Sequence, residues 1–485
     1  MPSRNLARLN ASPGDPMQRL VTTATLLFLF LAQAAWGQWS SNPAVNLALA
    51  NRAANDQVQP KLVPLKGNGW YVSWFDSNPF SPPPVGYDVF YQRLNAGGVQ
   101  EFRHGGIPVA DLSNSSTEDY GLDIDTHGNA LLTFLDTREG SNYQVTAAKM
   151  SSAGKAMWGP LGVQLTSGST DSNAVPKITG TSDGNIVVAW TSNSNVVLQK
   201  LNQAGQAQWG SGVVLSNSGY NLTLADLHAA DNGSVIVSWA QAQGFGSNSQ
   251  LWTNKVSSSG SLLWGSGGVN IFNVGSLQFG NFPYFIYDGN GGAVFAWYTS
   301  SPTLQCFAQH ILADGSAAFQ QGGVPVSSNS ADIRVEPLAA YNPATQEVFV
   351  FWTEEDSNQF YNGVSGQKFN STGQPQWGAD GLTITPLGND AQFFVTPVST
   401  GSGALVFWVD QPSYGASTIQ AINLGESGNT VCSQFAVSST PSNKGGLRAG
   451  ISSSGVTALV FSDDRIGNNA IYIQNVNPDC SLGPQ

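Results

Sequence analysis

Short apolar segments that end in an aromatic residue recur along the chain at a regular spacing. They end at Trp74, Phe134, Trp190, Trp239, Trp297, Trp352, Trp408 and Phe461. In a segment such as 186–190 nearly every position is apolar, which is typical of a strand that is covered on both faces. The interval of about 55 residues predicts a solenoid, a propeller or another array of repeats.

Each repeat adds three shorter elements around the aromatic strand. A short strand and a turn such as Asp183-Gly184-Asn185 precede it, and a third strand, ending near Leu201, follows it. Gly and Asn accept the positive φ of tight hairpins, so we expect neighbouring strands to pair antiparallel. The last strand is expected to open with an aromatic residue such as Trp209 and to close at about residue 215. Four strands per repeat predict the blade of a β-propeller.

The two ends of the chain complement each other. The eighth repeat stops before its fourth strand, whereas residues 38–49 read like the fourth strand of the other repeats. We expect this N-terminal strand to complete the last blade, because closing the ring leaves no free sheet edge. The sequence therefore predicts an all-β fold, a single eight-bladed propeller over residues 38–485. Two four-bladed units are the alternative, although no long linker divides the chain.

A glycine followed four residues later by an aromatic residue marks the last strand of six repeats. The aromatic positions are Phe102, Trp158, Trp209, Trp264, Phe319 and Trp377, with Trp39 at the N-terminal equivalent. The segment 256–265 (VSSSGSLLWG) resembles the repeats of secreted bacterial propellers and the tryptophan-docking repeats of quinoprotein-like propellers. This resemblance implies that the rings dock on the neighbouring blade. The chain lacks the adjacent cysteines of quinoprotein dehydrogenases, so no redox activity and no cofactor are carried over.

Residues 1–37 are predicted to be a secretory signal peptide, with Met17 as an alternative start. An uncharged, mostly apolar stretch at 21–35 follows Arg19 and precedes the small residues Ala35 and Gly37. A membrane anchor is the alternative, but the stretch is shorter than the roughly 18 residues that a span needs. We expect a secreted protein, extracellular or periplasmic, whose mature chain has no membrane span.

Composition narrows the choice of partner and of covalent links. The chain of 485 residues has 31 acidic and 19 basic side chains, a formal charge of −12 at pH 7. Without clusters of Lys and Arg it is not suited to nucleic acid. Three cysteines in an exported chain allow one disulfide. We expect it between Cys432 and Cys480, where it would join the last blade to its neighbour, and we expect Cys306 to be a buried free thiol.

Acidic residues follow the strand aromatic by two positions in five repeats, and two of them are followed by arginine. The set comprises Asp76, Asp136, Glu354, Asp410 and Asp463, with Arg138 and Arg465. The loops between repeats share this face of the propeller and add Asp119, Glu336, Tyr120, Tyr220, Phe282 and Tyr284, among others. One interpretation is a face that binds a cation, a sugar or a peptide. The alternative is that the acids cap their turns and pair locally.

Two further motifs receive a structural interpretation. Asp123 to Gly128 resembles the start of a calcium loop, but Phe134 stands where the last carboxylate ligand should be, so a β-turn is favoured over calcium. The G-x-S-x-G pattern at 180–184 lies in a predicted hairpin and not in the strand-to-helix turn that a nucleophile needs. The four histidines are scattered, and no metal site is assigned.

The first functional hypothesis is a secreted, monomeric and non-catalytic propeller that binds a glycan, a cation or an extracellular or envelope protein. The alternative is a hydrolase or lyase that acts on extracellular polysaccharide through carboxylates on the loop-rich face, and a purely structural repeat protein is a third reading. A pair of carboxylates about 5–10 Å apart would favour the enzyme. Dispersed acids beside exposed aromatic rings would favour binding.

Overall fold

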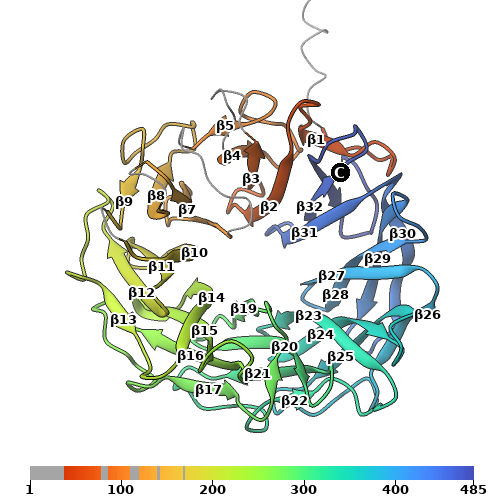
Figure 1. Ribbon diagram of the computed structural model, residues 1–485. Coiled ribbons are helices and arrows are strands. Elements are labelled where there is room, and N and C mark those ends of the chain that lie inside the picture. Colours follow the sequence, from red (N-terminus) through yellow and green to blue (C-terminus); the bar gives the residue numbers. More distant parts are fainter. Residues whose placement is uncertain (1–37, 78–85, 110–118, 139–141, 168–169, 485) are drawn as a thin grey trace, which may run out of the picture.

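The computed structural model describes residues 38–77, 86–109, 119–138, 142–167 and 170–484. Eight small antiparallel sheets stand in a ring (Figure 1). Their innermost strands line cavities at the centre of the ring, and this central space is called the channel below. The predicted eight-bladed β-propeller is thereby confirmed. In the part of the chain that is described, the one helical element is the 3₁₀ turn η1 (Asp231–Gly233). The predicted signal peptide lies outside the described residues.

In blades 1 to 4, the four strands of each blade follow one another along the chain from the innermost strand to the outermost. Blade 1 comprises β2 (Gln57–Pro64), β3 (Trp70–Ser77), β4 (Tyr87–Leu94) and β5 (Ile107–Pro108). Blade 2 comprises β6 (Gly121–Ile124), β7 (Ala130–Asp136), β8 (Gln144–Met150) and β9 (Val163–Gln164). Blade 3 comprises β10 (Asn173–Gly180), β11 (Ile186–Ser192), β12 (Asn195–Leu201) and β13 (Val213–Leu215). Blade 4 comprises β14 (Asn221–Ala229), β15 (Val235–Ala242), β16 (Gln250–Val256) and β17 (Val269–Phe272).

Blades 5 to 8 complete the ring, and in blade 5 the innermost position is divided between two short strands. Blade 5 comprises β18 (Ser276–Leu277), β19 (Phe285–Tyr287), β20 (Ala293–Ser301), β21 (Cys306–Ile311) and β22 (Val324–Pro325). Blade 6 comprises β23 (Ile333–Asn342), β24 (Glu347–Glu355), β25 (Asn362–Phe369) and β26 (Leu382–Gly388). Blade 7 comprises β27 (Ala391–Ser399), β28 (Gly403–Gln411), β29 (Ser417–Gly425) and β30 (Thr430–Ser442). Blade 8 comprises β31 (Lys444–Ile451), β32 (Thr457–Asp463), β33 (Ala470–Val476) and β1 (Leu47–Ala50).

The hydrophobic core lies between the blades. Trp70 and Val72 of β3 are fully buried and pack in one cluster with Val460 and Ile473 of blade 8. Equivalent clusters fill the other seven blade interfaces. The second strand of each blade therefore meets apolar neighbours on both faces, which explains its almost unbroken apolar sequence.

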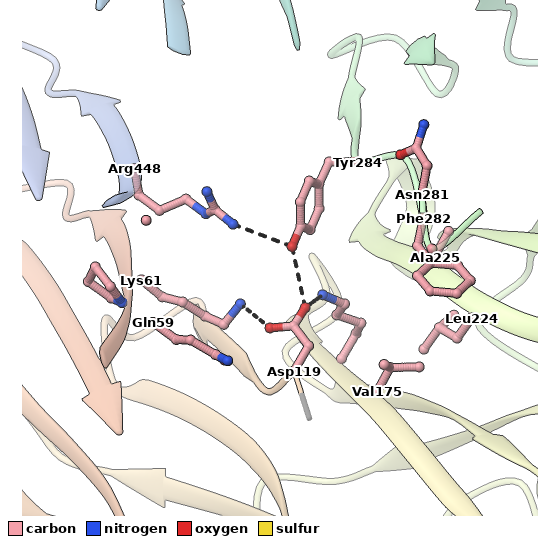
Figure 2. Close-up of a pocket in the computed structure, with 14 residues that line it drawn as sticks. Gln59, Lys61, Asp119, Val175, Leu224, Ala225, Asn281, Phe282, Tyr284 and Arg448 are labelled. Atoms are coloured by element: carbon pink, nitrogen blue, oxygen red, sulfur yellow. Dashed lines mark hydrogen bonds and ion pairs between the residues drawn. The ribbon is translucent and has the colours of Figure 1, made fainter. Parts of the chain in front are cut away.

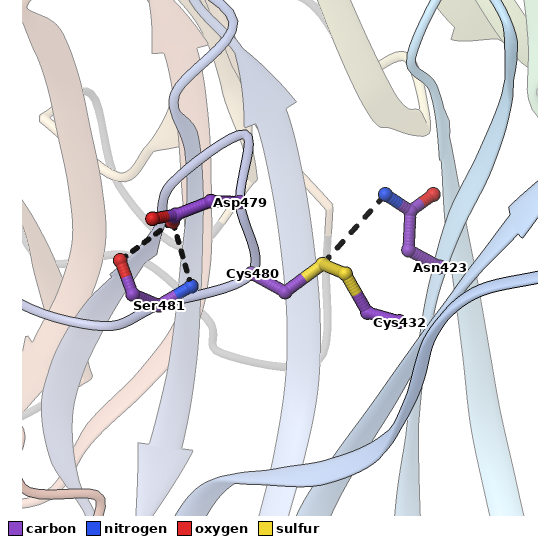
Figure 3. The surroundings of a disulfide bond; sticks show 5 residues. All are labelled: Asn423, Cys432, Asp479, Cys480 and Ser481. Atoms are coloured by element: carbon purple, nitrogen blue, oxygen red, sulfur yellow. Dashed lines mark hydrogen bonds between the residues drawn. A yellow bond between two sulfur atoms is a disulfide. The ribbon is translucent and has the colours of Figure 1, made fainter.

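The N-terminal strand closes the ring as predicted. β1 pairs antiparallel with β33, with Leu47 opposite Ile473 and Ala48 opposite Tyr472. A second link to blade 8 is a disulfide between Cys432 of β30 and Cys480, whose Cα atoms are 6.5 Å apart (Figure 3). Asn423 of β29 donates its side-chain amide to Cys480 Sγ at 3.7 Å. Cys306 is a buried free thiol, and burial raises its pKa well above the usual range.

On the outer rim, tryptophans contact the turn of the next blade. Trp264 Nε1 donates to the carbonyl oxygen of Ala313 at 3.0 Å, and its ring lies so close to Gly315 that a Cβ there would come within 2.8 Å. The same indole-to-carbonyl bond occurs at Trp39, Trp158, Trp209 and Trp377. Trp209 precedes the outermost strand and does not open it, because β13 contains only Val213–Leu215. These contacts link successive blades around the ring.

A second repeated feature joins the turn between the first two strands to the third strand of the same blade. Lys200 of β12 pairs with Asp183 at 2.6 Å. Equivalent pairs are Lys149–Asp125, Lys255–Asp231, His310–Asp288 and Lys368–Glu347. In the calcium-like motif, Asp125 also accepts bonds from the backbone N–H groups of His127 and Asn129. Its carboxylate is thus occupied by its own turn and by Lys149.

Candidate functional site

The innermost strands carry bulges where they enter the channel. In β2 the pairing register shifts between Val58 and Lys61, and in β10 it shifts between Ala174 and Lys177. The bulges contain residues with positive φ, which are Gln59, Val175, Glu336, Phe394 and Gly446. Such a conformation is strained for a β-branched or bulky residue. Bulges commonly re-aim the side chains beside them.

In the six blades whose inner strand has such a bulge, the residue after the bulge occupies an equivalent position, and blades 2 and 5 reach the same position without a bulge. Lys61 pairs with Ser73, the residue before the strand aromatic, and Lys177 pairs likewise with Ala189. The same pairing identifies Gly121, Asp226, Leu338, Thr396 and Arg448. In blade 5 the corresponding residue is Tyr284, which directly precedes β19 and its first pair, Phe285 with Phe295. The eight positions carry different chemistry, unlike the repeated residues of the outer rim.

Four blades contribute to one polar cluster around Asp119, and a fifth supplies its carboxylate (Figure 2). Lys61 Nζ lies 2.6 Å from one carboxylate oxygen of Asp119, and Lys177 Nζ bonds to the other. Tyr284 donates its hydroxyl to Asp119 at 3.4 Å and accepts a bond from Arg448 Nη2 at 3.4 Å. The cluster therefore reaches across the channel, from blade 2 through Tyr284 to blade 8.

Two cations also face the ring of Tyr284. Lys177 Nζ is 5.0 Å and Arg448 Cζ is 5.3 Å from the ring centroid. The positive charge of Lys177 lowers the pKa of the Tyr284 phenol below its usual value. Burial would raise the pKa of Asp119, but the ammonium groups of Lys177 and Lys61 outweigh it and hold that pKa far below the usual range. Burial would likewise lower the pKa of Lys177, and Asp119 outweighs it.

A cavity of about 510 Å³ opens above this cluster. Its charged lining residues are Lys61, Lys177, Arg448 and Asp119. The wall of this cavity thus carries three positive charges against one negative charge, within a chain whose formal charge is −12. Phe282 and Asn281 add an aromatic ring and an amide to the same wall (Figure 2). The volume is in the range of cavities that hold small ligands.

A second cavity of about 520 Å³ continues deeper along the same strands and shares Lys61, Lys177, Tyr284 and Arg448 with the first. Its further polar lining residues are Tyr120, Asp123, Asp226, His228 and Thr396. His228 Nε2 lies 3.0 Å from Asp226. Desolvation would lower the pKa of His228, but the carboxylate of Asp226 outweighs it and raises that pKa. Among the described residues, no group of three or more His, Cys, Asp or Glu side chains is arranged to hold a metal ion.

The acids predicted from their recurrence after the strand aromatic lie elsewhere. Asp136 is fully buried and pairs with Arg138 at 3.0 Å. Asp463 is also fully buried, between Lys444 at 3.1 Å and Arg465 at 2.6 Å. The remaining members contact near neighbours: Asp76 contacts Arg52 and Asn55, Glu354 contacts Arg334 and Trp352, and Asp410 accepts a bond from Gln392. None of these acids lines the cavities described above, and their contacts are the local pairs of the alternative interpretation.

The two tyrosines among the predicted ligand residues differ in position. Tyr120 is buried beside the deeper cavity, where its hydroxyl shares a bond with Ser73 Oγ at 2.9 Å and donates to the carbonyl oxygen of Gln59 at 3.1 Å. Tyr220 is half-buried and packs against the core between blades 3 and 4. The structure thus brings only Tyr120 near the channel.

Sequence reasoning named Asp119, Phe282 and Tyr284 among the loop residues but missed the three cations. Lys61 and Lys177 each follow a proline in an inner strand, and Arg448 lies at the equivalent position of blade 8. The signal was available as a departure from the repeat. The position of Lys61 in the inner strand is not basic in five of the eight blades. Aligning the repeats would therefore have shown that Lys61, Lys177 and Arg448 stand at equivalent positions facing the channel.

Comparisons with known proteins give only distant likenesses. No family model matches the sequence, and the search of curated proteins found no match. Solved structures with a similar fold include the polysaccharide lyase Uly1, with 9% identity and a TM-score of 0.44, over 86% of this chain and 89% of that one. A PL25 ulvan lyase bound to a GlcA–Rha3S saccharide has 11% identity and a TM-score of 0.45, over 82% and 97%.

A prolyl oligopeptidase B from Galerina marginata has 11% identity and a TM-score of 0.43, over 92% of this chain. The present chain spans 58% of that enzyme's length. At these identities and TM-scores, the likenesses say nothing about what this chain binds or catalyses. The resemblance to quinoprotein-like repeats stays a prediction. Within the described residues there is no helix that is both long and apolar enough to cross a bilayer.

Proposed function

We propose that the protein binds an anionic glycan, with a carboxylate- or sulfate-bearing sugar in the cavity above Asp119. The observation that carries the proposal is the convergence of Lys61, Lys177 and Arg448 on one cavity of an acidic protein. Positive charge gathered in a cleft attracts and orients an anion, and the negative remainder of the surface disfavours adsorption elsewhere.

Arg448 is the best-placed residue to contact the anion. Its guanidinium donates to the Tyr284 hydroxyl and to the carbonyl oxygen of Leu447, and in the described structure it forms no ion pair with a carboxylate. Arginine presents a planar fork that matches carboxylate and sulfate oxygens. Lys61 and Lys177 are held by Asp119, so they contribute fixed positive charge in a set position.

Phe282 and Tyr284 favour a sugar over a bare inorganic anion. Both rings line the cavity, and 38% and 39% of their surfaces are exposed. An aromatic ring offers an apolar face against which the C–H face of a sugar can pack. Asn281 in the same wall offers an amide group to hydroxyls.

Calorimetric titration with acidic and neutral oligosaccharides of equal length tests this proposal. We expect the acidic ligand alone to bind, and Arg448→Gln to weaken it about tenfold, which corresponds to about 1.4 kcal/mol. Arg93→Gln is the matched control. Arg93 pairs with Glu101 on the outer rim, so this variant also loses one positive charge, but outside the channel. Equal binding of both ligands, or equal losses in both variants, would refute an anion site in the channel.

A catalytic role is a second candidate, and the observation that favours it is the lowered pKa of Tyr284 inside the cavity. A group whose pKa approaches the working pH transfers protons more effectively. A polysaccharide lyase or hydrolase would produce shorter chains from an acidic polysaccharide, and elimination would add the ultraviolet absorbance of an unsaturated sugar. Turnover that Tyr284→Phe abolishes without loss of binding would favour the enzyme, and binding without any new chain ends would favour the non-catalytic protein.

A further inference from the structure

Two phenylalanines form an exposed pair beside the entrance of the channel. Phe245 is 96% exposed and Phe279 is 83% exposed, yet their ring centroids lie only 5.9 Å apart at an interplanar angle of 78°. Phe245 lies in the loop between β15 and β16 of blade 4, and Phe279 follows β18 of blade 5. Exposed apolar side chains that are contiguous, unlike single scattered ones, are a feature of interaction sites.

The pair lies on the same face as the cavity. The first residue of β14, Asn221, pairs with the last residue of β15, Ala242, so the loop that carries Phe245 leaves the edge at which β14 enters the channel. Leu224 and Ala225, just after that edge, line the cavity. The antiparallel pairing therefore sets the exposed ring and the cavity mouth on one side of the propeller.

A continuous segment connects the pair to the polar cluster. Phe279 is followed by Gly280, Asn281 and Phe282, which line the cavity, and then by Tyr284 of the cluster. Three peptide units separate Phe279 from Phe282, a distance of at most about 11 Å along the backbone. No heavy atom lies within 4 Å of a Cβ placed on Gly280, so the surface at Gly280, between Phe279 and Phe282, is open.

We propose that the ligand is a segment of a longer anionic polysaccharide, whose charged sugar sits in the cavity and whose next sugars pack along Phe282 and the Phe245–Phe279 pair. This inference rests on the proposed function and adds an extended binding track to it. Charge complementarity at the cavity selects an acidic chain, and the rings supply apolar faces outside it. An acidic protein segment would use the same chemistry, and the experiment below distinguishes it.

Affinity as a function of chain length tests the track. Wild type and the double variant Phe245→Ala/Phe279→Ala are titrated with an acidic monosaccharide, with the hexasaccharide of the same sugar and with an acidic peptide of similar length. We expect wild type to bind the hexasaccharide more tightly, and the double variant to lose about tenfold for the hexasaccharide and nothing for the monosaccharide. Phe360→Ala is the matched control, because Phe360 is 74% exposed in the corresponding loop of blade 6, and we expect no change.

The outcomes separate this inference from the proposed function. If monosaccharide and hexasaccharide bind wild type equally, or if the double variant binds both as wild type does, the track is wrong while the anion site stands. If no acidic saccharide binds, the proposed function fails first. If only an acidic peptide binds and the double variant loses it, the polysaccharide is overturned as the occupant. Both rings are exposed, so the melting temperatures of the variants should match wild type and exclude misfolding.

Discussion

The outer rim and the channel wall of this propeller come from the same repeats, but they differ in what is repeated. On the outer rim, the same kind of residue makes the same contact in blade after blade, as Trp209 and Trp264 do with the next turn. At the equivalent channel positions the residues are Lys61, Gly121, Lys177, Asp226, Tyr284, Leu338, Thr396 and Arg448. In this protein, residues that recur from blade to blade make structural contacts. The candidate site lies where equivalent positions carry different residues.

The acids after the strand aromatic illustrate the first half of this contrast. They recur in five blades, and the structure uses Asp136 and Asp463 in buried ion pairs with arginine or lysine of their own surroundings. Recurrence was therefore a signal of shared geometry. The cations of the channel illustrate the second half, because the position of Lys61, Lys177 and Arg448 is not basic in the other five blades.

Loss of an outer-rim ring should have the largest effect on stability. Trp264 is only 8% exposed, and Trp264→Ala should lower the free energy of unfolding by about 3–5 kcal/mol. Trp209 is half-buried, so Trp209→Ala should cost less. Urea denaturation measures both, and glycan affinity of the folded fraction should stay unchanged. A Trp264 variant as stable as wild type would contradict the structural role of the rim.

Loss of the disulfide should rank second. Cys432 and Cys480 close a loop with a sequence separation of 48. Replacing both with serine should lower the free energy of unfolding by about 2–4 kcal/mol, because the unfolded chain regains the freedom that the link removes. Denaturation of the double variant measures this, and reduction of the wild type should give a loss of the same size. A change confined to one of the two experiments would point to another cause.

Substitution of Asp119 should separate stability from binding within the channel. Asp119→Asn leaves two ammonium groups without their carboxylate, and we expect a loss of about 1–3 kcal/mol in unfolding free energy. The same change makes the cavity more positive, so the affinity for an acidic glycan should rise several-fold. Denaturation and calorimetry measure the two effects. A fall in affinity would contradict electrostatic attraction as the basis of binding.

The acid dependence of stability should change in the same variant. The pKa of Asp119 is held far below its unfolded value of about 4, so its contribution is present above that value. It is lost as the pH falls below about 4 toward the folded pKa. Asp119→Asn should remove this part of the acid destabilisation, which unfolding measured between pH 5 and pH 2 would reveal.

The smallest effect should come from Tyr284 at alkaline pH. The nearby charges are Lys177, Lys61, Arg448 and Asp119, and Lys177 lowers the phenol pKa below its usual value of about 10. As the pH rises through this lowered pKa, a phenolate forms and acidic glycan binding should weaken by about threefold, in keeping with a modest screened repulsion. Tyr284→Phe should abolish this alkaline decline. Binding that declines equally in the variant would assign the titration to another group.

Much of the fold could be predicted from the sequence because it depends on recurrence. Eight aromatic strands, their turns and the complementary ends indicated the ring and its closure by β1. The site could be predicted only in part. Asp119, Tyr284 and Phe282 were recognised as loop residues, but the bulges at Gln59 and Val175, which set the register of the lysines, depend on strained backbone that no local pattern announces.

The same limit applies to the acids that follow the strand aromatic, which were predicted from their spacing and lie outside the cavities of the channel. Asp76, Asp136 and Asp463 share a position two residues after the strand aromatic, near the end of the same strand, and all three are fully buried. Which side chains meet across the channel depends on pairing between blades that lie far apart in sequence, such as Asp119 with Tyr284 and Tyr284 with Arg448. Spacing within one repeat carries no information about those contacts.

A crystal structure of the protein soaked with an acidic trisaccharide is the most direct test of the central claim that the channel wall, and not the rim, is the binding surface. The account predicts density in the cavity, with carboxylate or sulfate oxygens within hydrogen-bond distance of Arg448 and Lys177. Density on the outer rim, or a cavity that stays empty while the trisaccharide binds in solution, would contradict it.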